Sequence, residues 1–244
     1  MRFLIKFSYD GTAYHGFQIQ PGLPTIEEEL KKALTKVNNN IPTNSVATGR
    51  TDHGVHALCQ YAHADLVVNI TENKLKRALN SNLPPDIHII STKVVDNNFH
   101  ARYNVKSKEY KYYLNMGEYN PLERNYVFQY NHELNIPNIK EGIKYFIGEH
   151  DFRAFVTENK DKENCVRTIT IAKVEEQDTI LIFTFKGTGF LRYQVRNMVG
   201  LLIRIGENKI SPETVEKILL SKDRTKAGKT APPEGLYLTN VEYN

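Results

Sequence analysis

One acidic side chain stands among basic neighbours in the stretch Gly49–Gln60, which reads GRTDHGVHALCQ. Asp52 follows Arg50 and precedes two histidines, and a glycine lies on each side of this group. Because glycine takes positive backbone φ without a steric clash, Gly49 and Gly54 allow a tight bend that presents the acid at a turn. Asp52 taken alone would be interpreted as a turn cap, since aspartate commonly accepts a backbone N–H there.

The same stretch contains the spacing His53-x-x-His56-x-x-Cys59, whose donor atoms are of the kind that zinc prefers. These three donors fall across a turn and a strand, and the sequence offers no fourth ligand. We therefore expect no metal here, and we interpret His56 as a histidine that is either packed or turned toward a ligand.

Composition is that of an ordinary globular chain of 244 residues, with 40% hydrophobic and 25% charged side chains. The net charge of +4 permits nucleic-acid binding without establishing it. The two cysteines, Cys59 and Cys165, provide no disulfide framework and indicate a reducing compartment. Neither a membrane-spanning run nor a signal-peptide pattern is present, so we expect a cytoplasmic protein.

Alternating and helical patterns predict an α+β fold that positions these residues. In the first half we expect strands at 1–8, 45–48, 58–68 and 87–95, and helices after the capping box Thr25-x-x-Glu28 and over 71–80. In the second half we expect a strand at 105–114, a helix ended by Gly148, and a hairpin of 165–175 with 179–186. A helix through Val195–Ile203, a last helix starting at Ser211-Pro212, a basic loop and a strand at 235–242 complete the pattern.

GRTDHGVHA resembles the GRTDAGVHA signature of the tRNA pseudouridine synthase A family. Further family-like stretches follow in the expected order and cover essentially the whole chain: YDGTAYHGFQIQ, NLPPDI, FHARYNVKSKEYKYYL, GFLRYQVRNMVG and APPEGLYL. The sequence departs from the family pattern at His53, where alanine is usual, at Phe17, where tryptophan is usual, and within Arg192–Gln194. These departures leave the residues that the chemistry needs in place.

The resemblance implies an RNA-modifying isomerase that converts uridine to pseudouridine in the tRNA anticodon stem-loop, at positions 38 to 40. The reaction breaks the N1–C1′ bond, turns the base and rejoins it through C5, so its stoichiometry requires no cofactor or metal. It requires a positioned carboxylate, and the resemblance makes Asp52 the nucleophile. Attack at C6 of the base and action at C1′ both remain open.

Three further residues receive roles from the resemblance. Tyr110 matches the tyrosine that stacks on the target uracil, whereas the plain interpretation is a strand aromatic that shares one face with Tyr112. Arg196, otherwise a solvated helix arginine, matches the arginine that pairs with the catalytic carboxylate. Arg50 is the other candidate partner of Asp52, although the resemblance suggests that it contacts RNA beside the flipped base.

We place a boundary near Phe99–Val105, which gives the parts 1–100 and 101–244. The resemblance implies that these are two α/β subdomains that share an extended antiparallel sheet, with the active cleft between them. It implies a homodimer. Other side chains could provide the phosphate-binding surface that RNA affinity requires: Tyr14, His15, Gln18, Arg102, Lys106, Lys108 and the loop Lys222–Lys229.

Two other functions fit parts of the sequence. A catalytically silent RNA-binding module could use the same scaffold, since fold does not fix function. The combination of Asp52, Tyr110 and Arg196 argues against it, because a binding module needs no paired acid and counter-charge. A metal-dependent RNA hydrolase using Asp52, His53 and His56 is the weakest alternative.

Overall fold

The computed structural model describes residues 1–156 and 164–243. The chain divides into two compact units, of which the first contains Met1–Lys106 and the final strand from Leu238 onward, and the second contains Ser107–Tyr237. The change of unit lies after Lys106, and the end of the chain belongs with its beginning.

The first unit is built on antiparallel strands in the order β4-β1-β3, with β2 beside β3. Their bounds are β1 Arg2–Tyr9, β2 Ser45–Ala47, β3 His56–Asp65 and β4 Ile87–Val95. Phe3, Ile5 and Phe7 of β1 are fully buried, which confirms the alternation predicted for this strand. Strand β3 begins two residues earlier than predicted and ends before Leu66.

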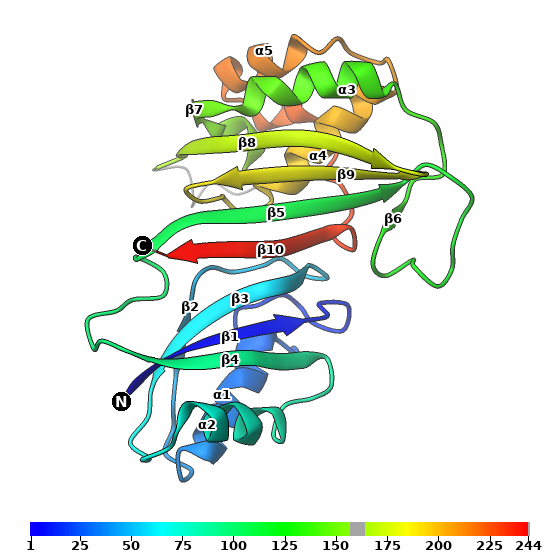
Figure 1. Cartoon of the computed structure of the whole chain (residues 1–244). Helices are drawn as coiled ribbons and strands as arrows, with labels where there is room; N and C mark the ends of the chain where they lie inside the picture. The colour runs from blue at the N-terminus through cyan, green and yellow to red at the C-terminus, as the bar shows by residue number, and fades with distance from the viewer. Residues whose placement is uncertain (157–163, 244) are drawn as a thin grey trace. The chain divides into compact units, whose positions relative to one another are not determined.

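Two helices pack beside each other in the first unit, α1 (Ile26–Val37) and α2 (Glu72–Asn80), and α2 lies against β4 (Figure 1). Both occur where the helical spacing of apolar residues predicted them. Burial of Ile26, Leu30 and Leu34 joins α1 to the core.

The predicted capping box at the start of α1 is wrong. The Thr25 side chain is buried and makes no capping hydrogen bond. Backbone carbonyls of the preceding loop satisfy the helix instead, because Gly16 O accepts from Ile26 N (3.3 Å) and Phe17 O accepts from Glu27 N (2.9 Å). The loop 14–20 is thus attached to the first turn of α1.

The second unit has antiparallel strands in the order β5-β9-β8-β7. Their bounds are β5 Val105–Asn115, β7 Gly148–Asp151, β8 Val166–Gln177 and β9 Ile180–Gly187; the short β6 (Phe128–Gln129) pairs parallel with β5. Strands β8 and β9 form the predicted hairpin, with positive φ at Asp178 in its turn. The predominance of antiparallel pairing, together with the helices, confirms the α+β class.

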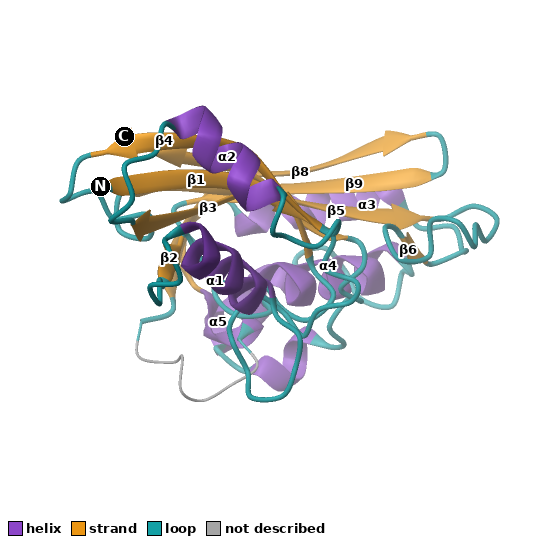
Figure 2. Ribbon diagram, turned by 90° about the horizontal axis from the view of Figure 1, so that it is seen from below, coloured by secondary structure: helices purple, strands orange, loops and turns teal. Residues whose placement is uncertain are grey.

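The α-helices of the second unit are α3 (Ile136–Gly142), α4 (Gln194–Gly206) and α5 (Thr214–Ser221), drawn in purple in Figure 2. Helix α3 contacts β8, and α5 contacts β7 (Figure 1). Strand β10 (Leu236–Tyr243) then leads from this unit into the first, where it is the neighbour of β3.

Two predicted helix boundaries in this unit are wrong. Gly148 does not end a helix, because α3 passes into a 3-10 helix over Ile143–Phe146 and Gly148, with φ +110°, begins β7. Pro212 does not begin α5 either. Ser211 O and Pro212 O accept from Thr214 N and Val215 N in a preceding turn, and the helix starts at Thr214.

Candidate active site

Asp52 lies, half-buried, in the turn that connects β2 to β3. Its carbonyl accepts from Val55 N at 3.2 Å, which closes the turn, and Gly54 has φ +74°. The predicted use of glycine is therefore confirmed at Gly54. Gly49 does not adopt positive φ, so the bend depends on one glycine.

Hydrogen bonds from three directions fix the residues before Asp52. The Gln60 side chain of β3 donates to Gly49 O at 3.0 Å. The hydroxyls of Tyr9, from β1, and Thr51 lie 2.8 Å apart, and Thr51 O accepts from Phe17 N at 3.1 Å. These bonds join the turn to rigid strands and to loop 14–20, so the backbone at Asp52 is pre-organised.

Backbone-to-backbone packing holds the other side of the turn. A Cβ on Gly11 would lie 2.1 Å from Val55 O, and one on Gly16, which has φ +89°, would lie 2.9 Å from Thr51 O. Gly54 N donates to Tyr14 O at 3.3 Å. Sequence reasoning missed this role of Gly11 and Gly16. Their place in the Asp10-Gly11 and His15-Gly16 pairs was the available signal.

Four exposed side chains of the Asp52 turn and of loop 14–20 form two contacts. Arg50 donates to the side chain of Gln18, and the rings of His15 and His53 lie 4.7 Å apart at 36°. Arg50 and His53 flank Asp52 in the sequence, and each contacts a side chain of loop 14–20.

The zinc spacing does not form a cluster. His56 is buried, and its Nδ1 accepts from Gly11 N at 3.1 Å, whereas His53 is exposed. Asp10 Oδ1 lies 3.2 Å from the same nitrogen, so the Nδ1 side of His56 faces the Asp10-Gly11 turn. Within residues 1–156 and 164–243, no three His, Cys, Asp or Glu side chains are grouped so that they could hold a metal.

Tyr110 lies on β5 in the second unit, with 8% of its surface exposed. It is paired with Phe185 across the sheet, and its ring meets Phe190 edge-on at 5.2 Å. Tyr112 shares this face, is fully buried and donates its hydroxyl to Pro232 O at 2.9 Å. Tyr112 is therefore the strand aromatic that was predicted, and the ring of Tyr110 is fixed by packing.

Arg196 is the third residue of α4 and is fixed by contacts on both sides. Its Nε donates to Ala231 O at 2.8 Å, and its own carbonyl accepts from Ala231 N at 3.1 Å. The guanidinium carbon lies 5.2 Å from the centroid of the Tyr193 ring. Tyr193 has φ +62°, an uncommon conformation for a residue with a side chain, at the position that caps the helix.

Glu234 is an acid of the second unit that sequence reasoning missed. Burial raises the pKa of its carboxyl group, while the charge of Arg196 opposes that rise. Glu234 belongs to the stretch Ala231–Leu238, whose resemblance to the family was the only available signal. The second unit thus contributes an arginine with an acid in its electrostatic range.

The site residues predicted from the sequence fall into two groups. Asp52 and Arg50 belong to one turn of the first unit, and Tyr110 and Arg196 belong to the second unit. The pairing of Asp52 with either arginine remains a prediction.

Comparison with known proteins identifies the class to which this fold and these residues belong. The family model described as tRNA pseudouridine synthase matches residues 5–104 and 143–244, so the chain belongs to the tRNA pseudouridine synthase family.

Individual relatives are similar over nearly their whole length. The tRNA pseudouridine synthase A of Limosilactobacillus reuteri (strain DSM 20016) is 43% identical over 249 residues, covering 99% of this chain and 96% of that protein. The protein of the same name from Streptococcus sanguinis (strain SK36) is 43% identical over 245 residues, with 99% and 98% covered. A solved Cbf5-Nop10-Gar1 complex aligns over 82% of this chain and 54% of that chain, at 12% identity and a TM-score of 0.34. At that score it adds nothing to the family assignment.

Proposed function

We propose that this chain is an isomerase that converts uridine to pseudouridine in tRNA. Family membership over the whole chain, combined with an aspartate held in a pre-organised turn at the family signature, is the observation that carries the proposal. If Asp52 served only as a turn cap, the turn would not need hydrogen bonds from two strands and from loop 14–20. A carboxylate that must meet a substrate atom does need them, because small misplacements lower rates strongly.

Asp52 is the nucleophile in this proposal. An ordinary aspartate, with a reference pKa of about 3.9, is ionised at neutral pH, so no pKa change is needed to activate it. The carboxylate adds to the flipped uridine at C6 or at C1′, the N1–C1′ bond breaks, the base turns, and a C5–C1′ bond forms. The bond to Asp52 then breaks and the free carboxylate is regenerated. C5 loses its proton and N1 gains one, so the product is an isomer of the substrate, and the proton transfer from C5 is the step that a positioned hydroxyl can assist.

The other three residues divide binding and charge control. Tyr110 presents a ring that is fixed by Phe190 and on which the extruded uracil stacks. Arg196, fixed by Ala231, supplies the counter-charge for the catalytic carboxylate. Arg50, which contacts Gln18 at the exposed rim of the turn, contacts the RNA beside the flipped base.

The substrate in this proposal is the anticodon stem-loop, at positions 38 to 40, and the enzyme acts as a homodimer in the cytoplasm. Both cysteines are free and buried, which suits a reducing compartment. Among the described residues, the helices are too short or too polar to cross a membrane. Light scattering tests the assembly: a homodimer doubles the chain mass of 28.1 kDa, and a single species at that chain mass would contradict it.

Pseudouridine mapping across cellular RNA, with and without this protein, tests the function and the choice of target together. We expect modification of uridines in the anticodon stem-loop of tRNA to disappear with the protein and to return with the wild-type chain. A chain that binds tRNA but leaves every uridine unchanged would support the silent binding module instead.

A further inference from the structure

A cavity of about 380 Å³ in the second unit is lined by three cationic side chains from three segments. Arg204 comes from α4, Lys217 comes from α5, and Lys226 comes from the 3-10 helix Arg224–Ala227. The rest of the lining is apolar or hydroxylic: Ile210, Thr214, Ile218 and Thr225. The lining therefore contains positive charge and no carboxylate.

A second cavity of about 560 Å³ in the same unit has the opposite character. Its lining includes Glu133 and Glu207 and contains no lysine or arginine. The excess of positive charge around Arg204, Lys217 and Lys226 is thus a local property of one cavity. It is not a general feature of this unit.

The Arg204 side chain is held in place within the basic cavity. Gly228 has φ +77°, and a Cβ there would lie 2.9 Å from both Cδ and Nη1 of Arg204. Nη1 also lies 3.4 Å from the carbonyl oxygen of Lys226, a long contact that leaves most guanidinium donors for a ligand. A cation that is ordered before binding loses less conformational entropy when an anion arrives.

Neighbouring carboxylates have other partners, although the charges of Arg204 and Lys217 also contribute to lowering the pKa of Glu207 and of Glu213. Glu207 accepts from the Tyr130 hydroxyl at 2.8 Å and pairs with Lys209 at 3.0 Å. Asp223 accepts from the backbone and hydroxyl of Thr225. The pKa of Glu213 is lowered mainly by Ser211, and Lys217 contributes to this shift through its charge.

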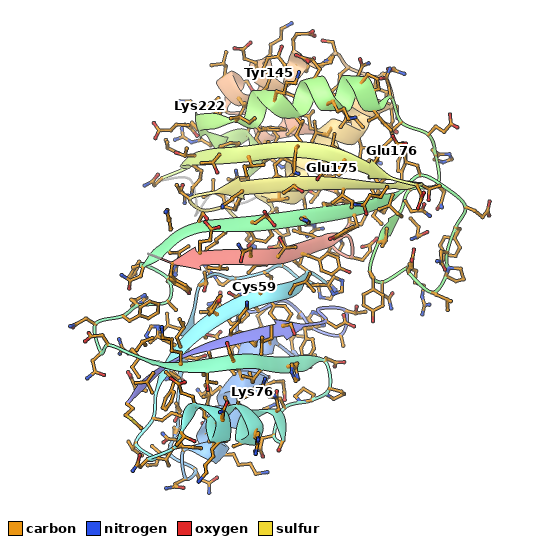
Figure 3. All side chains as sticks on the ribbon, in the orientation of Figure 1. Cys59, Lys76, Tyr145, Glu175, Glu176 and Lys222 are labelled. Atoms are coloured by element: carbon orange, nitrogen blue, oxygen red, sulfur yellow. The ribbon has the colours of Figure 1, made fainter. Side chains whose placement is uncertain are left out.

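The lysines in and near this cavity differ in whether they form an ion pair. Across residues 1–156 and 164–243, neither Lys217 nor Lys226 forms an ion pair. Lys222, in contrast, lies beside β7 (Figure 3), where its Nζ is 3.3 Å from the Asp151 carboxylate. Only part of the predicted basic loop Lys222–Lys229 thus has charge available for an anion.

We infer that this cavity binds a phosphate group of the tRNA backbone. Three cations from separate segments line one concavity, and two threonines also belong to its lining. Phosphate contacts position an RNA without reading its sequence, which is the role of a site outside the Asp52 turn. The inference rests on the proposed function for its substrate, since a free phosphate or mononucleotide carries the same chemistry.

The test measures tRNA binding across a series of salt concentrations for Lys217→Gln and Lys226→Gln. Each lost phosphate contact should reduce the slope of log K against log salt by about 0.7 to 0.9 and weaken binding several-fold at physiological salt. Matched controls are Lys144→Gln and Lys173→Gln, lysines of the same unit that pair with Glu141 and Glu175 at 2.8 Å (Glu175 is labelled in Figure 3). They remove the same charge and should leave the slope nearly unchanged.

Equal slopes for the cavity and control variants would overturn the inference. An inorganic phosphate titration at constant ionic strength, with the melting temperature as the readout, distinguishes a site for the tRNA backbone from a site for free phosphate. Phosphate binding that needs Lys217 and Lys226, combined with an unchanged tRNA slope, would assign the cavity to a small ligand and reject RNA. Conversion of bound uridine under single-turnover conditions should persist in the control variants Lys144→Gln and Lys173→Gln. Its absence in the wild type would count against the proposed function and leave the binding result intact.

Discussion

Gly200 in the middle of α4 lies against the backbone carbonyl of Lys229, and a Cβ at Gly200 would lie 1.9 Å from that oxygen. The contact is one of three along the helix. Ala231 is bonded to Arg196 at one end, and Gly228 packs on Arg204 toward the other. The segment Lys226–Ala231 therefore runs along α4 from the proposed phosphate cavity to the proposed catalytic arginine.

Gly200→Ala should destabilise the protein, although the same change in an exposed helix stabilises it by up to about 1 kcal/mol. The added methyl group meets a backbone carbonyl that cannot move without displacing the segment, so we expect a loss of about 1–3 kcal/mol in the free energy of unfolding. Urea unfolding measures it.

Gly206→Ala is the matched control on the same helix. A Cβ there would meet side-chain atoms of Ile139 and Leu134, and Ile139 Cδ1, the nearest at 2.7 Å, ends a flexible side chain. We expect a smaller loss. A Gly200→Ala protein as stable as the wild type would show that the segment does not pack on α4 as described.

Loss of the hydrogen bond between the hydroxyls of Tyr9 and Thr51 should lower the turnover rate more than the affinity for tRNA. Tyr9→Phe removes the hydroxyl that lies 2.8 Å from Thr51 Oγ1, while the ring remains in the core. We expect turnover of bound tRNA to fall by about tenfold to a hundredfold, since the turn that carries Asp52 loses one clamp. Single-turnover rates and binding titrations separate the two effects.

A double-mutant cycle with Thr51→Val provides the control for this bond. If the two hydroxyls act together, the double variant should be little slower than either single variant. Independent, additive losses would mean that the two residues affect turnover by separate routes.

Part of this architecture could be predicted from the sequence because it depends on local patterns. Alternation in β1, the hairpin β8–β9 and the apolar spacing in α1 and α4 each reflect one segment and its burial. The start of α1 could not be predicted in the same way, because its cap comes from the carbonyls of Gly16 and Phe17, which approach only after loop 14–20 has folded back.

The same limit applies to the site. Motif resemblance predicts roles for Asp52, Tyr110 and Arg196, but the hydrogen bonds that hold their segments join residues far apart in the chain. Gln60 reaches Gly49, and Ala231 reaches Arg196. The predicted basic loop illustrates the difference, since charge alone could not separate Lys222, which pairs with Asp151, from Lys226, which lines a cavity.

The free energy of unfolding should decrease as the pH falls from the unfolded pKa of His63 toward its lower folded pKa. This histidine is buried and accepts from Ala101 N at 3.1 Å through Nδ1. Burial lowers the pKa of His63, and the charges of Arg2 and His100 act in the same direction, against Asp65. The stabilisation is fully present above the unfolded pKa of about 6.5 and is lost as pH falls toward the folded value.

Urea unfolding of the wild type and His63→Gln at about pH 8 and about pH 5 tests this dependence. A glutamine side chain at this position cannot take up the proton, so the variant should lose less stability between the two conditions. Equal losses in both proteins would assign the pH dependence to other groups.

Tyr110→Phe should separate stacking from proton transfer. The variant retains the ring that meets Phe190 and lacks only the hydroxyl. If the hydroxyl assists removal of the C5 proton, turnover should fall about a hundredfold or more while tRNA affinity is largely kept. Wild-type turnover in this variant would leave Tyr110 with a stacking role alone.

The central claim is that the carboxylate of Asp52 performs the chemistry, and single-turnover conversion of uridine in tRNA by Asp52→Asn tests it most directly. Asparagine nearly preserves the size of the side chain and forms similar turns, so a capping role would survive the change. An amide cannot replace a carboxylate nucleophile, so we expect conversion to fall by many orders of magnitude. Melting temperature and tRNA affinity should remain near the wild-type values, because phosphate and stacking contacts are untouched. A folded, tRNA-binding Asp52→Asn protein that still makes pseudouridine at the wild-type rate would contradict the mechanism.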